Sequence, residues 1–169
     1  MAALASKQVC DGKGLQIGLV ASRYNGAIVE NLVHGAREAL RECGVADENV
    51  PLVWVPGSFE LPLAAKKMTE SGAYHAIVCI GCVIRGGTSH YDLVCAEAAR
   101  GISNVSLVTG VPAIFAVVTA DSMEQAEERS GAKMDNKGYE GGLAAVEMAA
   151  LVRSLEGPGS EGRNKGKRA

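Results

Sequence analysis

The sequence predicts an α/β fold in which a four-stranded parallel sheet lies between two layers of helices. Four short runs of apolar, largely β-branched residues recur along the chain, at residues 15–21, 50–55, 76–82 and 113–118. Segments with helical periodicity separate these runs, so that the order of elements reads βαβαβαβαα. Strands that alternate with helices form parallel sheets through right-handed crossovers, and the helices then cover both faces. The expected architecture is a three-layer αβα domain.

The first two helices have clear limits in the sequence. The helix after the first strand begins at about Asn25 and ends where Gly44 supplies the stop. Its apolar residues are spaced as one buried face, and they are Ile28, Val29, Leu32, Val33, Ala36, Ala39, Leu40 and Cys43. The second helix is expected over residues 59–71, because Pro62 is tolerated only in the first turn of a helix.

The second half of the chain adds three helices. The third helix is expected to start near Tyr91, and its buried residues are Val94, Cys95, Ala98, Ile102 and Val105. After the fourth strand, Ser122 caps a short helix. The last helix spans about residues 137–155, with Leu143, Val146, Leu151 and Val152 buried. Gly141 and Gly142 each weaken the start of this helix by roughly 1 kcal/mol relative to alanine.

The composition is that of an ordinary globular protein. The chain has 169 residues, of which 47% are apolar and 21% charged, and this length suffices to bury one substantial core. No apolar run reaches the length that spans a membrane, and the first ten residues carry no clear targeting signal. These features predict a cytoplasmic protein that does not bind membranes. A plastid location stays open if a transit peptide was removed.

The chain divides into three segments. Residues 1–14 are expected to form an N-terminal arm, residues 15–156 the folded domain, and residues 157–169 a disordered tail. Four basic residues against Glu161 give the tail a charge of about +3, although the whole chain carries −2. A basic tail can bind nucleic acid. This tail is short and lacks aromatic residues for base stacking, so we favour a solvated tail without a nucleic acid partner.

The five cysteines are expected to be free thiols, because their number is odd, their spacing is irregular and no secretion signal precedes them. Cys79 and Cys82 form a C-x-x-C pair. In a strand, however, residues three apart point to opposite faces, so the pair is poorly placed to share a metal or a disulfide. His34 and His75 have no partner at metal-ligand spacing. The sequence therefore predicts no metal site.

A glycine-rich loop between the third strand and the third helix is the clearest candidate for a binding site. Parallel α/β sheets bind ligands where their strands end, and Gly86 and Gly87 let the backbone turn tightly there. Thr88 and Ser89 add hydroxyl and N–H groups at the positive end of a helix, which favours a phosphate. His90 follows directly and suits proton transfer near neutral pH. Similar glycine-rich turns also occur without a ligand.

Two common classes of α/β enzyme are disfavoured by their missing motifs. The first strand ends in Ser-Arg-Tyr-Asn at residues 22–25 instead of G-x-G-x-x-G, which argues against a dinucleotide site. No G-x-S-x-G turn follows any of the expected strands, so a serine hydrolase would lack its nucleophile.

Four longer motifs occur in order along the chain. They are an Arg-aromatic-Asn triplet at Arg23, a Val-Pro-Gly-x-aromatic-Glu turn from Val55, a Val-Ile-Arg-Gly-x-Thr-x-His-aromatic-Asp loop from Val83, and an Asn-Lys-Gly triplet at Asn136. Together they resemble the lumazine synthase family over about residues 15–155. The resemblance implies a flavodoxin-like fold and a transferase. Its reaction would condense 5-amino-6-(D-ribitylamino)uracil with 3,4-dihydroxy-2-butanone 4-phosphate to 6,7-dimethyl-8-ribityllumazine, the penultimate step of riboflavin synthesis.

The resemblance also assigns roles to individual residues. The residues implied to hold the ribitylaminouracil are Tyr24, Asn25, Ser58, Phe59, Glu60, Cys82, Val83, Ile84 and Phe115. Tyr24 would stack on the pyrimidine ring, and the main chain of residues 82–84 would pair with its edge. The residues implied to bind the phosphate are Gly87, Thr88 and Arg129. His90 would be the catalytic proton shuttle, and Asp92 would orient or support it unless it serves only the helix start. Lys137 would help to bind the phosphate or simply face solvent. No metal or cofactor is implied, because an amine and a ketone react once they are oriented.

Some of these residues have simpler interpretations. The helix dipole alone favours Glu60 in a first turn, Phe115 suits core packing, and Arg129 suits a solvated helix face. Tyr24 stands where the family more often has Phe or Trp. Two rival functions are a non-catalytic flavin or pterin binding module and a purely structural shell protein. A binding module would have no use for His90 together with Arg129.

Oligomerisation is a further implication of the resemblance. In the family, the residues that match Phe115 and Arg129 come from a neighbouring subunit, and members form pentamers or twelve pentamers closed into an icosahedral shell. We expect residues 7–14 to add a strand to the sheet edge of a neighbouring subunit. The short connection at residues 131–138 favours the 60-subunit shell over the free pentamer. Riboflavin synthase is a candidate protein partner.

Overall fold

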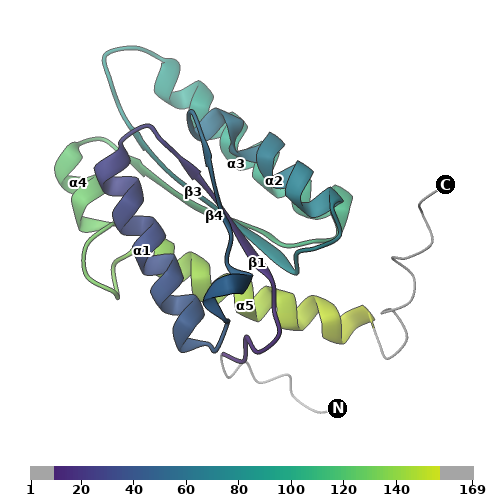
Figure 1. Cartoon of the computed structure of the whole chain (residues 1–169). Helices are drawn as coiled ribbons and strands as arrows, with labels where there is room; N and C mark the ends of the chain where they lie inside the picture. Colours follow the sequence, from purple (N-terminus) through teal and green to yellow (C-terminus); the bar gives the residue numbers. More distant parts are fainter. Residues whose placement is uncertain (1–9, 157–169) are drawn as a thin grey trace, which may run out of the picture.

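The structure of the chain, a computed structural model, describes residues 10–156 (Figure 1). The tail expected at residues 157–169 and most of the N-terminal arm lie outside the described residues. The strands are β1 Ile17–Ser22, β2 Leu52–Val55, β3 Ala76–Ile84 and β4 Ala113–Ala120. The helices are α1 Gly26–Glu42, α2 Leu61–Glu70, α3 His90–Thr109, α4 Met123–Glu128 and α5 Lys137–Glu156. Two 3-10 turns, η1 Asp47–Asn49 and η2 Ser58–Glu60, precede β2 and α2.

The four strands form one parallel sheet in the order β2-β1-β3-β4, between two layers of helices. Side chains of α2 and α3 share one apolar cluster with the strand residues that face them, and those of α1, α4 and α5 share the other. Neighbouring strand residues alternate between the two clusters: Ile77 belongs to the first and Val78 to the second. The predicted three-layer αβα fold is confirmed. None of the described helices combines the length and apolar character that a membrane span requires.

The third strand runs further than the sequence predicts. β3 continues to Ile84, and β4 pairs with it to the end, where Ile84 lies opposite Ala120. β1 pairs with β3 only as far as Ala21, opposite Ile80. The last residues of β3 therefore project beyond the pairing with β1, and one of their edges is left open at the carboxyl end of the sheet.

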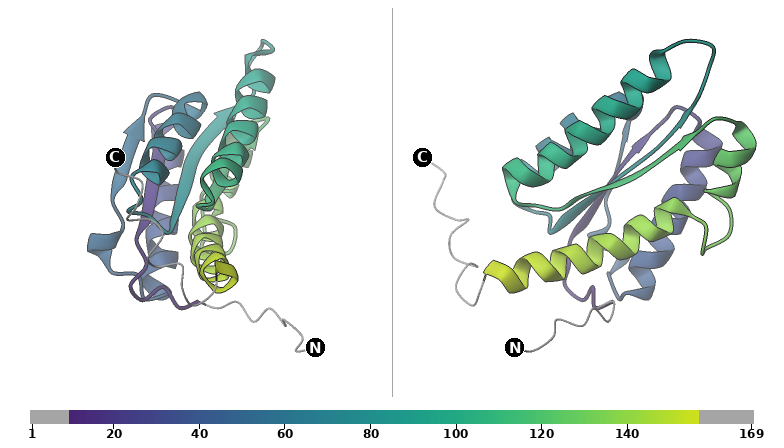
Figure 2. Two further views of the ribbon diagram at one scale, coloured as in Figure 1. Left: turned by 90° about the vertical axis from the view of Figure 1, so that its right-hand side faces the viewer. Right: turned by 180° about the vertical axis from the view of Figure 1, so that it is seen from behind.

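The glycines of α5 are explained by close packing. A Cβ added at Gly141 would lie 2.9 Å from the Cβ of Ala116, and one added at Gly142 would lie 2.8 Å from the carbonyl oxygen of Ala36. Their small size lets α5 approach β4 and α1, which offsets the helix propensity that they lose. Further along, Leu151 is 40% exposed, so the prediction that it is buried was wrong. The C-terminal end of α5 extends past the strands (Figure 1 and Figure 2).

A disulfide overturns the expectation that all five cysteines are free. Cys10 and Cys43 are bonded, with their Cα atoms 4.8 Å apart, and Gly12 donates its N–H to the Cys43 carbonyl at 2.6 Å. The chain folds back from the start of β1 onto the end of α1, a proximity that cysteine spacing does not reveal. Residues 10–14 thus lie in a turn against their own helix. The remaining cysteines, Cys79, Cys82 and Cys95, are free as predicted.

We expect reduction of this disulfide to lower the free energy of unfolding by roughly 3–4 kcal/mol, because the bond closes a long loop in the unfolded chain. The two cysteines are 33 residues apart in sequence. Denaturant unfolding with and without a reductant measures the change. The matched control is Cys10→Ser, at an exposed position, whose stability should not respond to the reductant. Equal stability of the oxidised and reduced wild-type protein would contradict this expectation.

Candidate active site

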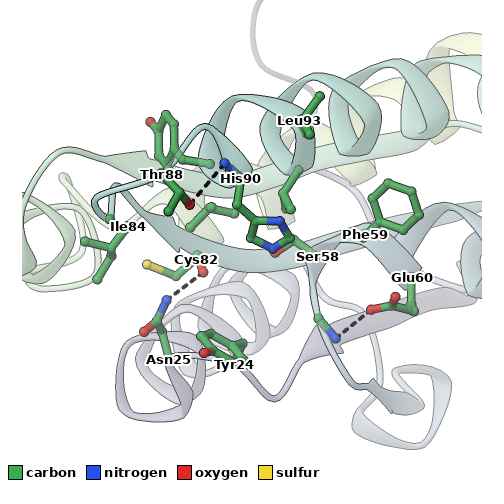
Figure 3. Close-up of a pocket in the computed structure, with 15 residues that line it drawn as sticks. Tyr24, Asn25, Ser58, Phe59, Glu60, Cys82, Ile84, Thr88, His90 and Leu93 are labelled. Carbon is green, nitrogen blue, oxygen red and sulfur yellow. Dashed lines mark hydrogen bonds between the residues drawn. The ribbon is translucent and has the colours of Figure 1, made fainter.

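A crevice of about 610 Å³ opens at the carboxyl ends of β1, β2 and β3, against the first turns of α3 (Figure 3). Parallel sheets bind their ligands at this edge. Ten of the residues selected from the sequence line it, namely Tyr24, Asn25, Ser58, Phe59, Glu60, Cys82, Val83, Ile84, Thr88 and His90. Three motifs that are far apart in the sequence therefore meet in one place.

Asn25 joins the end of β1 to the end of β3. Its backbone is left-handed, with φ 55° and ψ 46°, a conformation that asparagine adopts more readily than most residues. Its side-chain amide donates to the Cys82 carbonyl at 2.9 Å. The same turn presents Tyr24 at the crevice with 74% of the residue exposed. The face of the Tyr24 ring is thus available for stacking against a flat ligand.

The turn after β2 forms a second wall of the crevice. Glu60 accepts the N–H of Gly57 through Oε2 at 2.9 Å, which fixes the turn η2. This hydrogen bond gives the carboxylate a structural role, while its Oε1 makes no hydrogen bond within the described chain. Phe59 is exposed at the rim, and the buried hydroxyl of Ser58 has no partner among the described residues. The turn therefore leaves Glu60 Oε1 free for a ligand, whereas the Ser58 hydroxyl is enclosed next to Gly81.

The free edge of β3 supplies backbone groups to the crevice. Arg85 donates its N–H to the carbonyl of Ala120 on β4 at 2.9 Å. Because successive residues of a strand direct their backbone groups to opposite sides, Cys82 and Ile84 direct theirs away from β4, to the side where the pairing with β1 has ended. Asn25 already occupies the Cys82 carbonyl. The N–H and C=O of Ile84 are the groups best placed to pair with a ligand edge.

The buried thiols of β3 are unsuited to nucleophilic chemistry. Burial raises the pKa of Cys82 to about 11 and that of Cys79 to about 12. The thiolate is the nucleophilic form of cysteine, so both side chains are neutral and unreactive near pH 7. Cys82 contributes to the crevice as an apolar wall.

The loop at residues 86–89 brings unpaired N–H groups next to His90. The helix α3 begins at His90, so the imidazole stands on its first turn. Within the described chain, the N–H groups of Gly87, Thr88 and Ser89 donate to no protein group, whereas the N–H of His90 donates to Thr88 Oγ1 at 3.4 Å. Free donors at the positive end of a long helix favour an anion.

The two glycines of this loop are not required by its backbone conformation. Neither Gly86 nor Gly87 has a positive φ, and a Cβ built on either residue meets nothing within 4 Å. The tight turn expected from the sequence is therefore not the reason for these glycines. Their lack of side chains leaves the N–H groups of the loop uncovered.

Five of the selected residues do not line this crevice, namely Gly87, Asp92, Phe115, Arg129 and Lys137. Phe115 is half-buried and packs against the apolar cluster under α2 and α3. Arg129 and Lys137 both pair with Glu140, at 3.0 and 2.9 Å. Burial acts to raise the pKa of Glu140, but Lys137 and Arg129 outweigh it and lower the pKa. One carboxylate thus holds both Arg129, which the resemblance assigns to the phosphate, and Lys137, the further candidate for that site.

Asp92 forms its ion pair with Arg85, at 3.1 Å, rather than with His90. The imidazole of His90 makes no hydrogen bond to any described residue. Asp92 therefore does not orient His90 by direct contact in this chain.

An apolar wall on α3 was missed from the sequence. Tyr91, Leu93 and Val94 line the crevice, and Leu93 is 63% exposed. They follow His90 by one, three and four residues, and the last two of these spacings place side chains on the same face of a helix. That spacing would have revealed Leu93 and Val94 once His90 was taken as the helix start.

Comparison with known proteins agrees with this geometry. The model of one protein family, described as 6,7-dimethyl-8-ribityllumazine synthase, matches residues 14–153. Two curated proteins of that name, from two strains of Clostridium kluyveri, are each 47% identical to the chain over 146 residues. The matched region covers 86% of this chain and 95% of each relative.

Proposed function

This chain belongs to the 6,7-dimethyl-8-ribityllumazine synthase family, and from that premise we propose which of its residues carry the reaction. The chain is a transferase of riboflavin biosynthesis. It condenses 5-amino-6-(D-ribitylamino)uracil with 3,4-dihydroxy-2-butanone 4-phosphate and releases phosphate and water. The crevice must therefore hold a flat pyrimidine with a ribityl chain, bind a phosphate and move protons between an amine and a carbonyl.

The pyrimidine is held between Tyr24 and the free edge of β3. The exposed ring of Tyr24 offers a flat face for stacking, and the N–H and C=O of Ile84 suit the donor and acceptor groups of a uracil edge. Val83 directs its backbone toward β4, so it contributes side-chain contact. Asn25 acts by fixing the turn that carries Tyr24 and by holding the Cys82 carbonyl.

The ribityl chain lies along the turn after β2. Glu60 Oε1 accepts a hydroxyl of the ligand, while Oε2 keeps its hydrogen bond to Gly57. The backbone of Ser58 and Phe59 completes this wall.

The phosphate binds the N–H groups of Gly87 and Thr88, and Arg129 of a neighbouring copy adds a charge-assisted hydrogen bond. The unpaired donors at the start of α3 support the first half of this assignment. The second half rests on the position of Arg129, which does not line the crevice of its own chain. Lys137 shares Glu140 with Arg129 and enters the same site. Phe115 of the neighbouring copy covers the pyrimidine.

His90 transfers the protons of the reaction. The amine attacks the carbonyl, a Schiff base forms, phosphate leaves and the ring closes, and each step moves a proton near the phosphate loop. The observation that carries this proposal is the position of His90 in the first turn of α3, directly after the free N–H groups of residues 87–89. The proton donor and the leaving phosphate are thereby adjacent.

Replacing Arg129 with alanine should raise the KM for the butanone phosphate about 10–100-fold, because a hydrogen bond to a charged group contributes roughly 1.5–3 kcal/mol. The KM for the ribitylaminouracil should stay within a few-fold of the wild-type value. Steady-state kinetics that follow lumazine absorbance measure both constants. Arg41→Ala removes another exposed arginine, paired with Asp47, and serves as the control. An unchanged KM for the butanone phosphate would remove Arg129 from the phosphate site.

The pentamer is the minimum active assembly in this proposal, and we favour the closed shell of twelve pentamers. Exposed apolar residues on α3 support association, since Leu107 is 82% exposed. The connection at residues 131–138 is held close to α1, because the Asn136 amide donates to the carbonyl of Asn31 at 3.1 Å. A compact connection leaves room for contacts between pentamers. Riboflavin synthase as a partner and a cytoplasmic location complete the proposal.

A further inference from the structure

We propose that Arg85 is a positioning residue for the reaction: its side chain fixes both ends of the phosphate loop at residues 86–89 and thereby sets where His90 stands. This inference rests on the proposed role of that loop and of His90. Arg85 does not line the crevice, so it acts through the groups that do.

The side chain of Arg85 contacts three residues at once. Its Nε donates to Asp121 Oδ1 at 2.8 Å, directly after β4. Its Nη1 lies 3.1 Å from Asp92 Oδ1 in the first turn of α3. The guanidinium also lies over the ring of Tyr91, 4.0 Å from the centroid. One planar group therefore ties the end of β3 to the end of β4 and to the start of α3.

These contacts close the loop on itself. Arg85 is the last residue before the loop, and its backbone N–H is held by Ala120 of β4 at 2.9 Å. Tyr91 and Asp92 are the two residues that follow His90. Because the Arg85 side chain contacts both Tyr91 and Asp92, the loop and His90 lie between two fixed points, the end of β3 and the first turn of α3. The loop supplies little restraint of its own, since a side chain at Gly86 or Gly87 would point into open space.

The chemistry of arginine suits this task in a way that lysine does not. A guanidinium presents several N–H donors in a fixed plane and stacks on an aromatic ring through its face. It can thus serve Asp121, Asp92 and Tyr91 together. An ammonium is a single charge centre without a planar face, so a lysine at this position would retain only part of the contact set.

The effect of Arg85 should appear in catalysis rather than in stability. The side chains of Arg85, Asp92 and Asp121 are 43%, 61% and 68% exposed. Exposed ion pairs contribute little to the free energy of unfolding, because water screens them. A displacement of about 1 Å at a reacting group, in contrast, can lower a rate on the order of 100-fold.

Arg85→Met keeps the apolar stem and removes the guanidinium. We expect kcat to fall about 10–100-fold, the KM for the butanone phosphate to rise, and the KM for the ribitylaminouracil and the melting temperature to change little. Arg85→Lys should recover part of kcat. Arg41→Met is the control, because its pair with Asp47 has side chains 60% and 65% exposed, and its kinetics should match the wild type.

A double variant separates positioning from direct phosphate binding. If Arg85 positions the loop, Asp92→Asn with Asp121→Asn should lower kcat and raise the KM for the butanone phosphate, as Arg85→Met does. If Arg85 instead binds the phosphate itself, removal of its two carboxylate partners would free it and lower that KM. A lower KM in the double variant overturns the inference.

Hydrogen exchange of the intact assembly tests the positioning directly. In Arg85→Met, the amides of residues 92 and 93, which donate to the carbonyl of Ser89 at the start of α3, should exchange faster than in the wild type, while those of the sheet stay protected. Unchanged exchange at these amides would refute the role of Arg85 alone, because the start of α3 would then stand without its guanidinium. Faster exchange with wild-type kinetics would refute the phosphate loop itself, and with it the proposed function of residues 86–90.

Discussion

Replacing His90 with alanine should lower kcat about 10–1,000-fold and leave both KM values within a few-fold of the wild type. Proton transfer is one contribution to the rate, beside the orientation of two substrates that react without a covalent intermediate on the protein. The binding groups assigned here, such as Tyr24 and the N–H groups of residues 87–89, do not depend on the imidazole. The variant should therefore bind its substrates and turn them over slowly.

Steady-state kinetics on pure protein measure this result. His34→Ala removes an exposed histidine of α1 that does not line the crevice, and its kcat should equal that of the wild type. Small imidazoles in solution should restore part of the His90→Ala rate, because the crevice opens to solvent. Full activity of His90→Ala would refute the proton-transfer role, and a complete loss of turnover would indicate a role beyond proton transfer.

The fold was largely predictable because its strands and helices differ in apolar period. All four strands read as short apolar runs, although β2 is largely exposed, and α1 shows one apolar face, so the order of elements followed from spacing alone. The predictions failed where the exposure or packing of a residue depends on its position in the tertiary structure. Leu151 fits the helical period but lies where α5 has passed the sheet. Gly142 looked unfavourable for a helix until its contact with Ala36 was known.

In the candidate site, too, features set by the local sequence could be predicted, and contacts between distant segments could not. Strand ends in a parallel sheet share one edge, so the motifs at Tyr24, Glu60 and His90 were expected to meet there. The partners of charged residues were not predictable, since Asp92 pairs with Arg85 and Arg129 with Glu140 through geometry that no local pattern encodes. The disulfide of Cys10 was missed for the same reason.

A site shared between subunits predicts that the isolated chain is inactive and that two impaired variants restore each other. In a ring with head-to-tail contacts, each crevice combines His90 of one chain with Arg129 of the next. Co-expressed in equal amounts, His90→Ala and Arg129→Ala chains should assemble at random. Roughly a quarter of the sites then contain both wild-type residues, so activity should approach a quarter of the wild-type value at low butanone phosphate.

The mixed assembly decides between a shared and an unshared site. If each site lay within one chain, every site of the mixture would contain one of the two substitutions. The activity would then be the mean of the two variants measured alone. Mixing the variants after assembly is the control and should give that mean, because closed rings do not exchange subunits quickly.

Light scattering on the same samples reports the size of the assembly. With a 17.5 kDa chain, the pentamer has a mass of about 90 kDa and the 60-subunit shell about 1 MDa. Activity in a fraction with the mass of one chain would refute the shared site, because a lone chain brings neither Arg129 nor Phe115 to its own crevice.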